Sequence, residues 1–259
     1  MPKCLVCYKW TLDEQDIKIK AEDLSLDSSR AKGKISDFDR NAIEEAALLV
    51  EKNGGAVDAL TYGAASVKQS LKDALSRGPE KVFWIADASA DSADASLTAM
   101  VLASVIRKIG PYDLILCGEG SSDLFNQQTA SRLAALLGLP CLSFVQKLSV
   151  EGDTVKATRK LEDCQEELTV KTTVVISVLS EINKPRIPTM RQVLGAAKKP
   201  NEEIKIGDLG LKPEELQPKA VRKSVKGFVM ERKNQIYKES SAADNVAKLK
   251  ASLATEGLY

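Results

Sequence analysis

The feature that most constrains the fold is an alternation of short apolar runs with longer amphipathic stretches along the first two-thirds of the chain. Residues 4–8, 56–62, 81–86 and 113–117 have the length and composition of buried strands. The stretches between them carry apolar residues at helical spacing and end in Lys or Arg, with a glycine within two residues. Strands that alternate with helices favour a parallel sheet covered on both faces. The sequence therefore predicts an α/β fold with a doubly wound, mainly parallel sheet.

The chain changes character after the fourth run and its following helix. Residues 142–179 contain strand-like runs separated by a turn at 151–153 and an acidic turn, which predicts an antiparallel addition ending in a buried strand. Five of the nine prolines fall within residues 181–220, where long apolar runs are few. We expect residues 1–182 to form the α/β domain and residues 183–259 to form an extended arm. The arm should end in an amphipathic helix over 241–258 that docks on another chain.

Charge and composition exclude several classes of function. Lys plus Arg number 37 and Asp plus Glu number 36, so no net field would attract nucleic acid or an anionic membrane surface. The N-terminal apolar run is too short for a signal peptide or a membrane span, which leads us to expect a cytoplasmic protein. Five irregularly spaced cysteines indicate reduced thiols. Cys4 and Cys7 form a C-x-x-C, but in a strand they point to opposite faces, which disfavours a redox or zinc role.

Catalytic signatures are missing from the sequence. The chain contains no histidine, so Ser-His-Asp and Cys-His nucleophiles and the commonest metal ligand are absent. It has no G-x-x-x-x-G-K-[ST] motif for triphosphate chemistry. The first strand is followed by Lys9-Trp10-Thr11 rather than a glycine-rich turn, which argues against a Rossmann NAD domain and an adenylating pyrophosphatase. We therefore expect ligand binding without turnover, and no metal.

A glycine-rich turn follows the fourth strand-like run and leads into a helix. In open α/β sheets ligands bind at the carboxyl ends of strands, where backbone N–H groups and a helix N-terminus favour anions. Gly118 and Gly120 would let the backbone approach a phosphate. Neutral hydrogen bonds could come from Ser121, Ser122, Asn126, Gln127, Gln128 and Thr129. A turn that only carries a Ser or Asp helix cap explains the same residues, so the local sequence leaves both interpretations open.

Three segments resemble the β subunits of electron-transfer flavoproteins, especially the branch tied to nitrogen fixation and carnitine metabolism. They are ISDFDRNAIEEAALL (35–49), DLILCGEGSSDLFNQQTA (113–130) and EINKPRIPTMRQVLGAAKKP (181–200). The third is the most specific, since Asn183, Pro185, Arg186, Pro188, Thr189 and the closing Ala-Ala-Lys-Lys-Pro follow the family pattern. Ser36 and Asp37 replace the usual Asn-Pro, Cys164 stands where glycine is common, and Thr173 replaces a proline.

The resemblance implies a non-catalytic electron carrier subunit of adenine-nucleotide-binding type. Its arm would embrace a larger subunit that holds the redox-active FAD, and the chain itself would bind AMP or a second FAD. Electrons would come from a flavin dehydrogenase, such as one of the acyl-CoA dehydrogenase type, or from a ferredoxin-type donor, and would pass to a second redox protein. We expect the heterodimer to bind no nucleic acid and to have no membrane span.

The resemblance also implies the site residues. The nucleotide would contact Cys7 and Tyr62 at the ends of two strands. Its base and ribose would be bound by the loop of Ser36, Asp37, Phe38 and Asp39. Its phosphate would be bound by a second loop, with Gly118, Gly120, Ser121, Ser122, Asp123, Gln127, Gln128 and Thr129. Ile182 would anchor the dehydrogenase, although a core residue at a strand end fits equally well. For Arg186 we favour a flavin or subunit contact over an arm-to-body salt bridge. Lys198 and Lys199 are expected to be a solvated pair.

Two other functions are compatible with parts of the sequence. A stand-alone nucleotide-binding module of the universal-stress type predicts a homodimer, but it does not explain the proline-rich arm. An ATP-dependent pyrophosphatase of the same fold superfamily would need a Ser-Gly-Gly loop after the first strand, and this sequence has none there.

Overall fold

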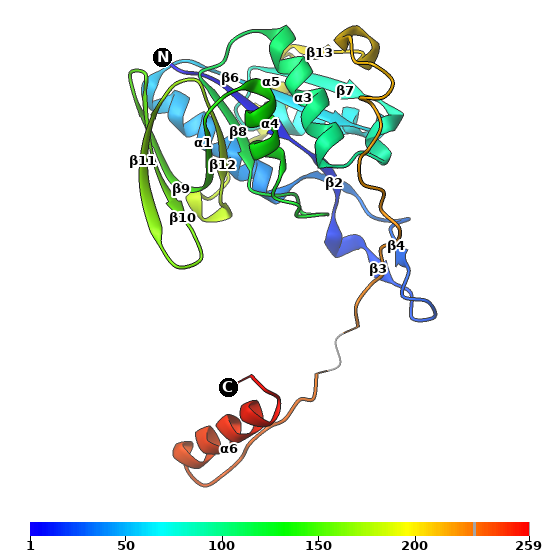
Figure 1. The fold of residues 1–259 in the computed structure, drawn as a ribbon, viewed down its shortest axis with the longest axis vertical. Helices are drawn as coiled ribbons and strands as arrows, with labels where there is room; N and C mark the ends of the chain where they lie inside the picture. Colours follow the sequence, from blue (N-terminus) through cyan, green and yellow to red (C-terminus); the bar gives the residue numbers. More distant parts are fainter. Residues whose placement is uncertain (230–231, 259) are drawn as a thin grey trace. The chain divides into compact units, whose positions relative to one another are not determined.

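The central sheet is built from the apolar runs of the sequence. In the computed structural model, which describes residues 1–229 and 232–258, nine strands pair in the order β11-β10-β9-β12-β8-β1-β6-β7-β13 (Figure 1). Their bounds are β1 (Lys3–Tyr8), β6 (Ala56–Gly63), β7 (Lys81–Ala86), β8 (Leu114–Gly118), β9 (Cys141–Glu151), β10 (Thr154–Lys160), β11 (Gln165–Lys171), β12 (Val174–Val178) and β13 (Asn201–Glu203). The four predicted runs correspond to β1, β6, β7 and β8, and the ladders of these strands are parallel.

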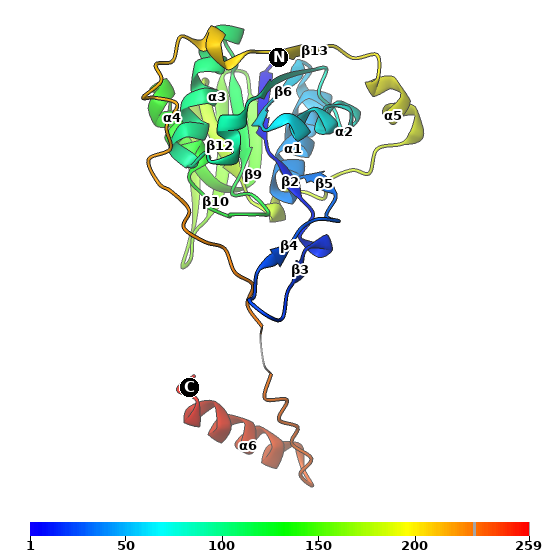
Figure 2. The same ribbon diagram turned by 90° about the vertical axis from the view of Figure 1, so that its right-hand side faces the viewer.

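Helices cover both faces of the sheet, as the alternation predicts. One core contains Cys4, Val6 and Tyr8 of β1 with the apolar sides of α1 (Asp37–Asn53) and α2 (Leu71–Ser76). The other contains Leu5 and Cys7 with α3 (Ala95–Ile109) and α4 (Thr129–Leu137). Figure 2 shows α1 and α2 on the opposite side of the strands from α3 and α4. The doubly wound fold is confirmed, and the two thiols of the C-x-x-C lie in different cores.

Helix ends agree with the expected signals. Gly54 follows α1 with φ of 72°, and Gly138 ends α4 in the left-handed conformation and donates its N–H to the carbonyl of Ala134. Asp94 caps α3 by accepting a hydrogen bond from the N–H of Leu97. The helical stretch expected between the second and third strand runs is split, because a 3-10 segment (Ala65–Ser70) precedes α2.

The antiparallel addition consists of β9, β10 and β11. The turn between β9 and β10 has Gly152 with φ of 63°, and β10 pairs antiparallel with both neighbours. The buried strand that follows, β12, differs in direction, since it runs parallel to β8 and β9 and so extends the parallel part of the sheet. Five of its five residues are buried, as its unbroken apolar sequence requires.

Smaller elements complete the fold. An antiparallel pair joins β2 (Trp10–Leu12) to β5 (Gly33–Ile35). The remaining short strands are β3 (Lys18–Ile19) and β4 (Leu26–Asp27). The other 3-10 helices cover Glu14–Asp16, Ala88–Asp91, Ser180–Ile182 and Ile206–Leu209. In the C-terminal third, α5 (Met190–Ala196) starts with a capping box between Thr189 and Gln192, and β13 adds an edge strand parallel to β7.

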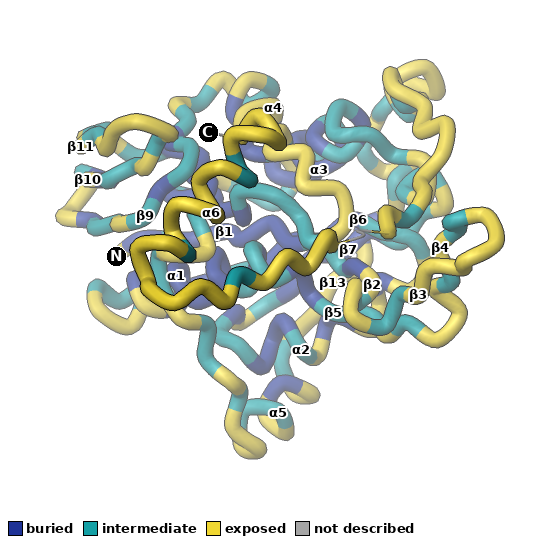
Figure 3. The backbone as a smooth tube through the Cα atoms, turned by 90° about the horizontal axis from the view of Figure 1, so that it is seen from below, coloured by how far each residue is buried: buried dark blue, intermediate teal, exposed yellow. Residues whose placement is uncertain are grey.

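The chain divides into two compact units, residues 1–18 with 26–225 and residues 19–25 with 226–259. Met230, Glu231 and Tyr259 of the expected arm lie outside the described residues. In the second unit, α6 (Ala242–Thr255) forms within the predicted stretch and most of its residues are exposed (Figure 3). The expected boundary between the α/β domain and the arm, after residue 182, stays a prediction. Among the described residues, no helix combines the length and apolar character needed to cross a membrane.

Candidate functional site

A cavity of about 240 Å³ lies at the carboxyl ends of the central strands. From β1 the chain winds through β6 to β7 on one side, whereas β8 and β12 lie on the other, so the topology reverses between β1 and β8. Ligands of open α/β sheets bind at such a reversal. The walls come from residues at or after the ends of β1, β6, β7 and β8. The cavity is therefore where the topology predicts a ligand site.

The loop after β8 approaches the first turn of α1 very closely. A Cβ at Gly118 would lie 2.7 Å from Oδ1 of Asp39 and 2.7 Å from the carbonyl carbon of Phe38, so no side chain fits there. A Cβ at Gly120 would lie 2.6 Å from the ring of Phe125. Phe125 itself adopts a left-handed conformation with φ of 45°, as does Gln127 with φ of 55°. Such conformations are costly for non-glycine residues and concentrate at functional loops.

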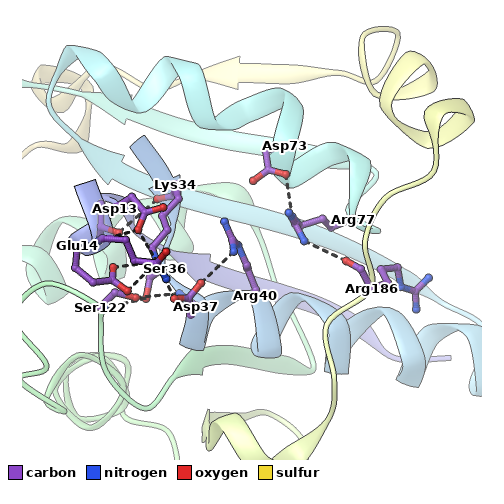
Figure 4. Close-up of polar contacts among 12 residues, drawn as sticks. Asp13, Glu14, Lys34, Ser36, Asp37, Arg40, Asp73, Arg77, Ser122 and Arg186 are labelled. Carbon is purple, nitrogen blue, oxygen red and sulfur yellow. Dashed lines mark hydrogen bonds and ion pairs between the residues drawn. The ribbon is translucent and has the colours of Figure 1, made fainter. Parts of the chain in front are cut away.

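Hydrogen bonds tie the start of α1 to this loop. Oγ of Ser36 accepts from the N–H of Ser122 (3.2 Å), and Oγ of Ser122 accepts from the N–H of Asp37 (3.1 Å). Figure 4 shows the two serines facing each other. Ser36 is fully buried, so its hydroxyl is committed to this contact. The short hydroxyl of Ser36 thus joins two loops of the site.

Asp39 lies in the cavity wall and holds two strand ends together. Its Oδ2 accepts from the N–H of Lys9 (2.8 Å) at the end of β1, and its Oδ1 accepts from the N–H of Gly118 (3.1 Å) at the end of β8. The carboxylate is almost fully buried, and burial raises the pKa of Asp39 to about 7, although both N–H groups oppose the shift. Asp39 therefore shapes the site through the backbone on both sides of the topological reversal.

Asp37 points away from the cavity into a cluster of charges. Its carboxylate accepts from Nζ of Lys34 (2.9 Å) and from Nη1 of Arg40 (3.0 Å), as the dashed lines in Figure 4 show. Lys34 also pairs with Asp13 and Glu14. Burial opposes the charge of Lys34, but these hydrogen bonds outweigh it and raise its pKa. Asp37 stabilises the start of α1 rather than forming a wall of the cavity.

The structure brings together only part of the residues expected to bind the nucleotide. Those that line the cavity are Cys7, Asp39, Tyr62, Gly118, Gly120, Ser121, Gln127 and Thr129. The others surround it without lining it: Ser36, Asp37, Phe38, Ser122, Asp123 and Gln128. Phe38 packs on Phe125 with ring centroids 5.0 Å apart, and Gln128 accepts a hydrogen bond from Nε of Arg132 (2.9 Å). These outer residues support the loop.

Sequence reasoning missed one wall of the cavity. The segment after β7 contributes Ala90, Asp91, Ala93, Asp94 and Ala95. Its position follows from topology, because β7 is parallel to β6 and ends at the same edge of the sheet. Lys9 and Trp10 were also missed as wall residues. Lys9 directly follows β1, and the same argument about strand ends would have found it.

Two free cysteine thiols of the cavity wall lie next to each other on neighbouring strands. Cys7 and Cys117 lie opposite each other in the register of β1 and β8, and both are buried in the cavity floor. The hydrogen bond that the Cys117 thiol shares with Cys7, together with burial, raises the pKa of Cys117. A thiol with a raised pKa is a poor nucleophile. Within residues 1–229 and 232–258, no group of three or more His, Cys, Asp or Glu side chains is arranged to hold a metal ion.

The residues expected to meet a partner make contacts within the chain. Ile182 is half-buried and packs against the core that contains α1. Arg186 forms a bidentate ion pair with Glu44, with Nε to Oε2 at 2.7 Å and Nη2 to Oε1 at 2.9 Å, and a second ion pair with Glu51. Lys199 is half-buried and donates to the carbonyls of Leu75 and Pro79. The expectation that Lys199 is solvated is therefore wrong. A partner role for Ile182 or Arg186 stays a prediction.

Comparison with known families gives a match over most of the chain. Residues 23–209 match the family model described as the electron transfer flavoprotein domain. The match includes α1, the loop after β8 and the segment with Asn183 and Arg186.

Proposed function

The chain belongs to the electron transfer flavoprotein domain family, and from this premise we propose that it is the β-type subunit of a heterodimeric electron-transfer flavoprotein. Members of this family are flavoproteins that carry electrons rather than catalyse a reaction of their own. The nitrogen-fixation and carnitine-metabolism branch remains our assignment within the family. The five free cysteines support the proposal that the protein works in the cytoplasm.

The observation that carries the proposal is the cavity at the topological reversal. Its volume of about 240 Å³ lies below the usual range for drug-sized ligands and suits one mononucleotide unit. We propose that this unit is AMP, or the AMP half of a second FAD. The phosphate would take backbone N–H groups near Gly120 and Ser121, and the N-terminus of α4 at Thr129. Tyr62 and Cys7 would border the nucleoside.

The redox chemistry would come from the FAD held by the larger subunit, since flavins exchange electrons with dehydrogenases and acceptors. This chain would bind its own nucleotide, help to shape the flavin pocket and offer a surface to the electron donor. The donor would be a flavin dehydrogenase, such as one of the acyl-CoA dehydrogenase type, or a ferredoxin-type protein.

Exposed apolar residues near the start of the arm suit the dehydrogenase. Ile187 is 91% exposed, Met190 74% and Leu194 62%, and all three lie on or next to α5. Hydrophobic anchors of this kind dominate protein interfaces when they enter a pocket on the partner. We propose that these three residues contact the dehydrogenase.

Purification of the native complex tests this proposal. A heterodimer with a larger flavin-containing chain is expected, and mass identification of the released nucleotides distinguishes one flavin plus AMP from two flavins. A homodimer with one adenine nucleotide per chain and no flavin would favour the universal-stress alternative instead.

A double variant tests the nucleotide site. Gln127→Ala with Thr129→Ala, two residues that line the cavity, should weaken nucleotide retention, because each lost hydrogen bond to a charged phosphate costs about 1.5–3 kcal/mol. Arg132→Ala is a matched control, since Arg132 contacts Gln128 on the outside of α4. An unchanged nucleotide content in the double variant after gel filtration would contradict the phosphate-loop assignment.

A further inference from the structure

Asp123 lies in the loop after β8, but a carboxylate cannot donate a hydrogen bond to a phosphate. Its own contacts are those of an anion. Oδ1 accepts from Oγ of Ser121 (2.5 Å) and from the N–H of Leu124 (2.8 Å), and Oδ2 lies 2.5 Å from Nζ of Lys9. A hydroxyl, a backbone N–H and an ammonium group are the donors that bind phosphate groups in proteins.

The three donors border the cavity. Lys9, Ser121 and Leu124 all line it, and Lys9 is the sole Lys or Arg among its described wall residues. The other charged residues of the wall are Asp39, Asp91, Asp94 and Glu119. A nucleotide phosphate that enters this acidic surrounding therefore has one cation available to it, and that cation is engaged by Asp123.

The Asp123 carboxylate is held in its charged form. Burial opposes the charge, but the ion pair with Lys9 and the hydrogen bonds from Ser121 and Leu124 outweigh burial and lower the pKa of Asp123. The ion pair is partly exposed, with 41% of the Lys9 side chain and 36% of the Asp123 side chain accessible. Pairs this exposed are weak, so a phosphate can displace the carboxylate from Lys9.

We propose that Asp123 is an internal competitor for the nucleotide phosphate, and that Lys9 is the phosphate-binding cation which Asp123 releases when the nucleotide binds. This inference rests on the proposed nucleotide site. It assigns opposite effects to two residues of one ion pair: Lys9 increases the affinity for a phosphorylated ligand, and Asp123 reduces it.

Titration calorimetry of the full chain with AMP and with adenosine separates these roles. Asp123→Asn should bind AMP about two- to fivefold more tightly, the range that corresponds to an exposed ion pair. Lys9→Met should bind AMP at least about tenfold more weakly, because a charge-assisted hydrogen bond is lost. Neither change should alter the affinity for adenosine, which lacks the phosphate. Glu151→Gln is the matched control, because it removes one carboxylate from an exposed ion pair with Lys156 on the β9–β10 hairpin and should leave both affinities unchanged.

The results overturn the inference if Asp123→Asn weakens AMP binding or leaves it unchanged, or if adenosine affinity changes in parallel. Circular dichroism checks that each variant folds. If the Asp123→Asn variant does not fold, Asp123→Ser is used in its place. If the wild-type chain binds AMP but Asp123→Asn does not tighten it, the competitor role fails while the nucleotide site stands. If no form of the chain binds AMP, the nucleotide site fails and the inference fails with it.

Discussion

The two parts of the C-terminal third, residues 183–204 and residues 232–258, are both polar in sequence but are held in different ways. The first part is fixed by side chains with buried partners. Nδ2 of Asn41 donates to the carbonyls of Ser180 and Asn183, and Nδ2 of Asn183 donates to the carbonyl of Asn41. Arg186 meets a buried carboxylate on α1, and β13 joins the sheet.

The second part is held by exposed contacts within its own unit. Lys248 pairs with Glu239, and the hydroxyl of Tyr237 donates to Oγ of Ser252 (2.6 Å). Val246 and Leu249 of α6 are 63% and 47% exposed. The comparison teaches that polar side chains fix an arm when their partners are buried, whereas exposed pairs add little. An amphipathic helix with an exposed apolar face is what we expect of a segment that docks on a larger subunit.

Hydrogen exchange on the isolated chain should show the largest difference between the two parts. The N–H of Ile204, which donates to the carbonyl of Trp84, should exchange more than about a thousandfold slower than an unprotected amide. Amides of α6 should exchange within about tenfold of the unprotected rate, because an isolated helix of this length is marginal. Uniform protection through residue 258 would contradict the need for a partner.

Removal of the ion pair between Arg186 and Glu44 should cause the next largest effect, a loss of stability. Arg186→Ala leaves the Glu44 carboxylate, which is only 7% exposed, without its cation. We expect thermal or urea unfolding to show a loss of about 3 kcal/mol. The matched control is Lys248→Ala in the second part, which should change stability by less than about 0.5 kcal/mol. Equal effects of the two variants would remove the contrast between the regions.

Two apolar residues of the first part should behave in opposite ways. Ile182 packs against the core, so Ile182→Ala should cost about 1–2 kcal/mol of stability and leave electron transfer intact at a permissive temperature. Met190 is exposed, so Met190→Ala should leave the melting temperature nearly unchanged and slow transfer from the dehydrogenase. Melting curves and steady-state transfer measure both. Slowed transfer without destabilisation in Ile182→Ala would instead favour Ile182 as the anchor.

Acid should loosen the first part slightly. The hydrogen bond and ion pair with Arg186 lower the pKa of Glu51, although burial opposes the shift. A lowered pKa means that this stabilisation is complete above the unfolded-state pKa and is lost as the pH falls through the folded-state pKa. Because Glu51 is largely exposed, the change should be below about 1 kcal/mol. Glu51→Gln should abolish this component of the acid dependence between neutral pH and pH 3.

The sequence predicted the elements whose side chains repeat with a regular period. The strands β1, β6, β7 and β8 and the helices α1, α3 and α4 follow from apolar spacing, and Gly118 and Gly120 marked the loop of the site. The strand β13 could not be found in this way, because its sequence Asn-Glu-Glu has no apolar residue whose spacing would mark a strand.

Long-range polar pairs were equally hidden. Arg186 and Glu44 are 142 residues apart, and Ser36 and Ser122 are 86 apart, so no local pattern links either pair. The cavity wall formed by the segment after β7 could have been predicted from the sheet topology, but no sequence motif marks it. Sequence therefore located the glycine-rich loop after β8 and the edge of the sheet, whereas the division of the loop residues into cavity walls and outer supports required the packing of α1 against β8.

The strand β13 has a consequence for any shortened form of the protein. It covers β7, whose sequence KVFWIA is apolar and rich in strand-forming residues. A fragment that stops at residue 182 would lack this cover and would present β7 as a bare edge of the sheet. Uncovered apolar edges recruit strands from other molecules and lead to aggregation. We therefore expect the short, acidic β13 to prevent self-association through β7. It must be retained in any fragment intended to stay monodisperse.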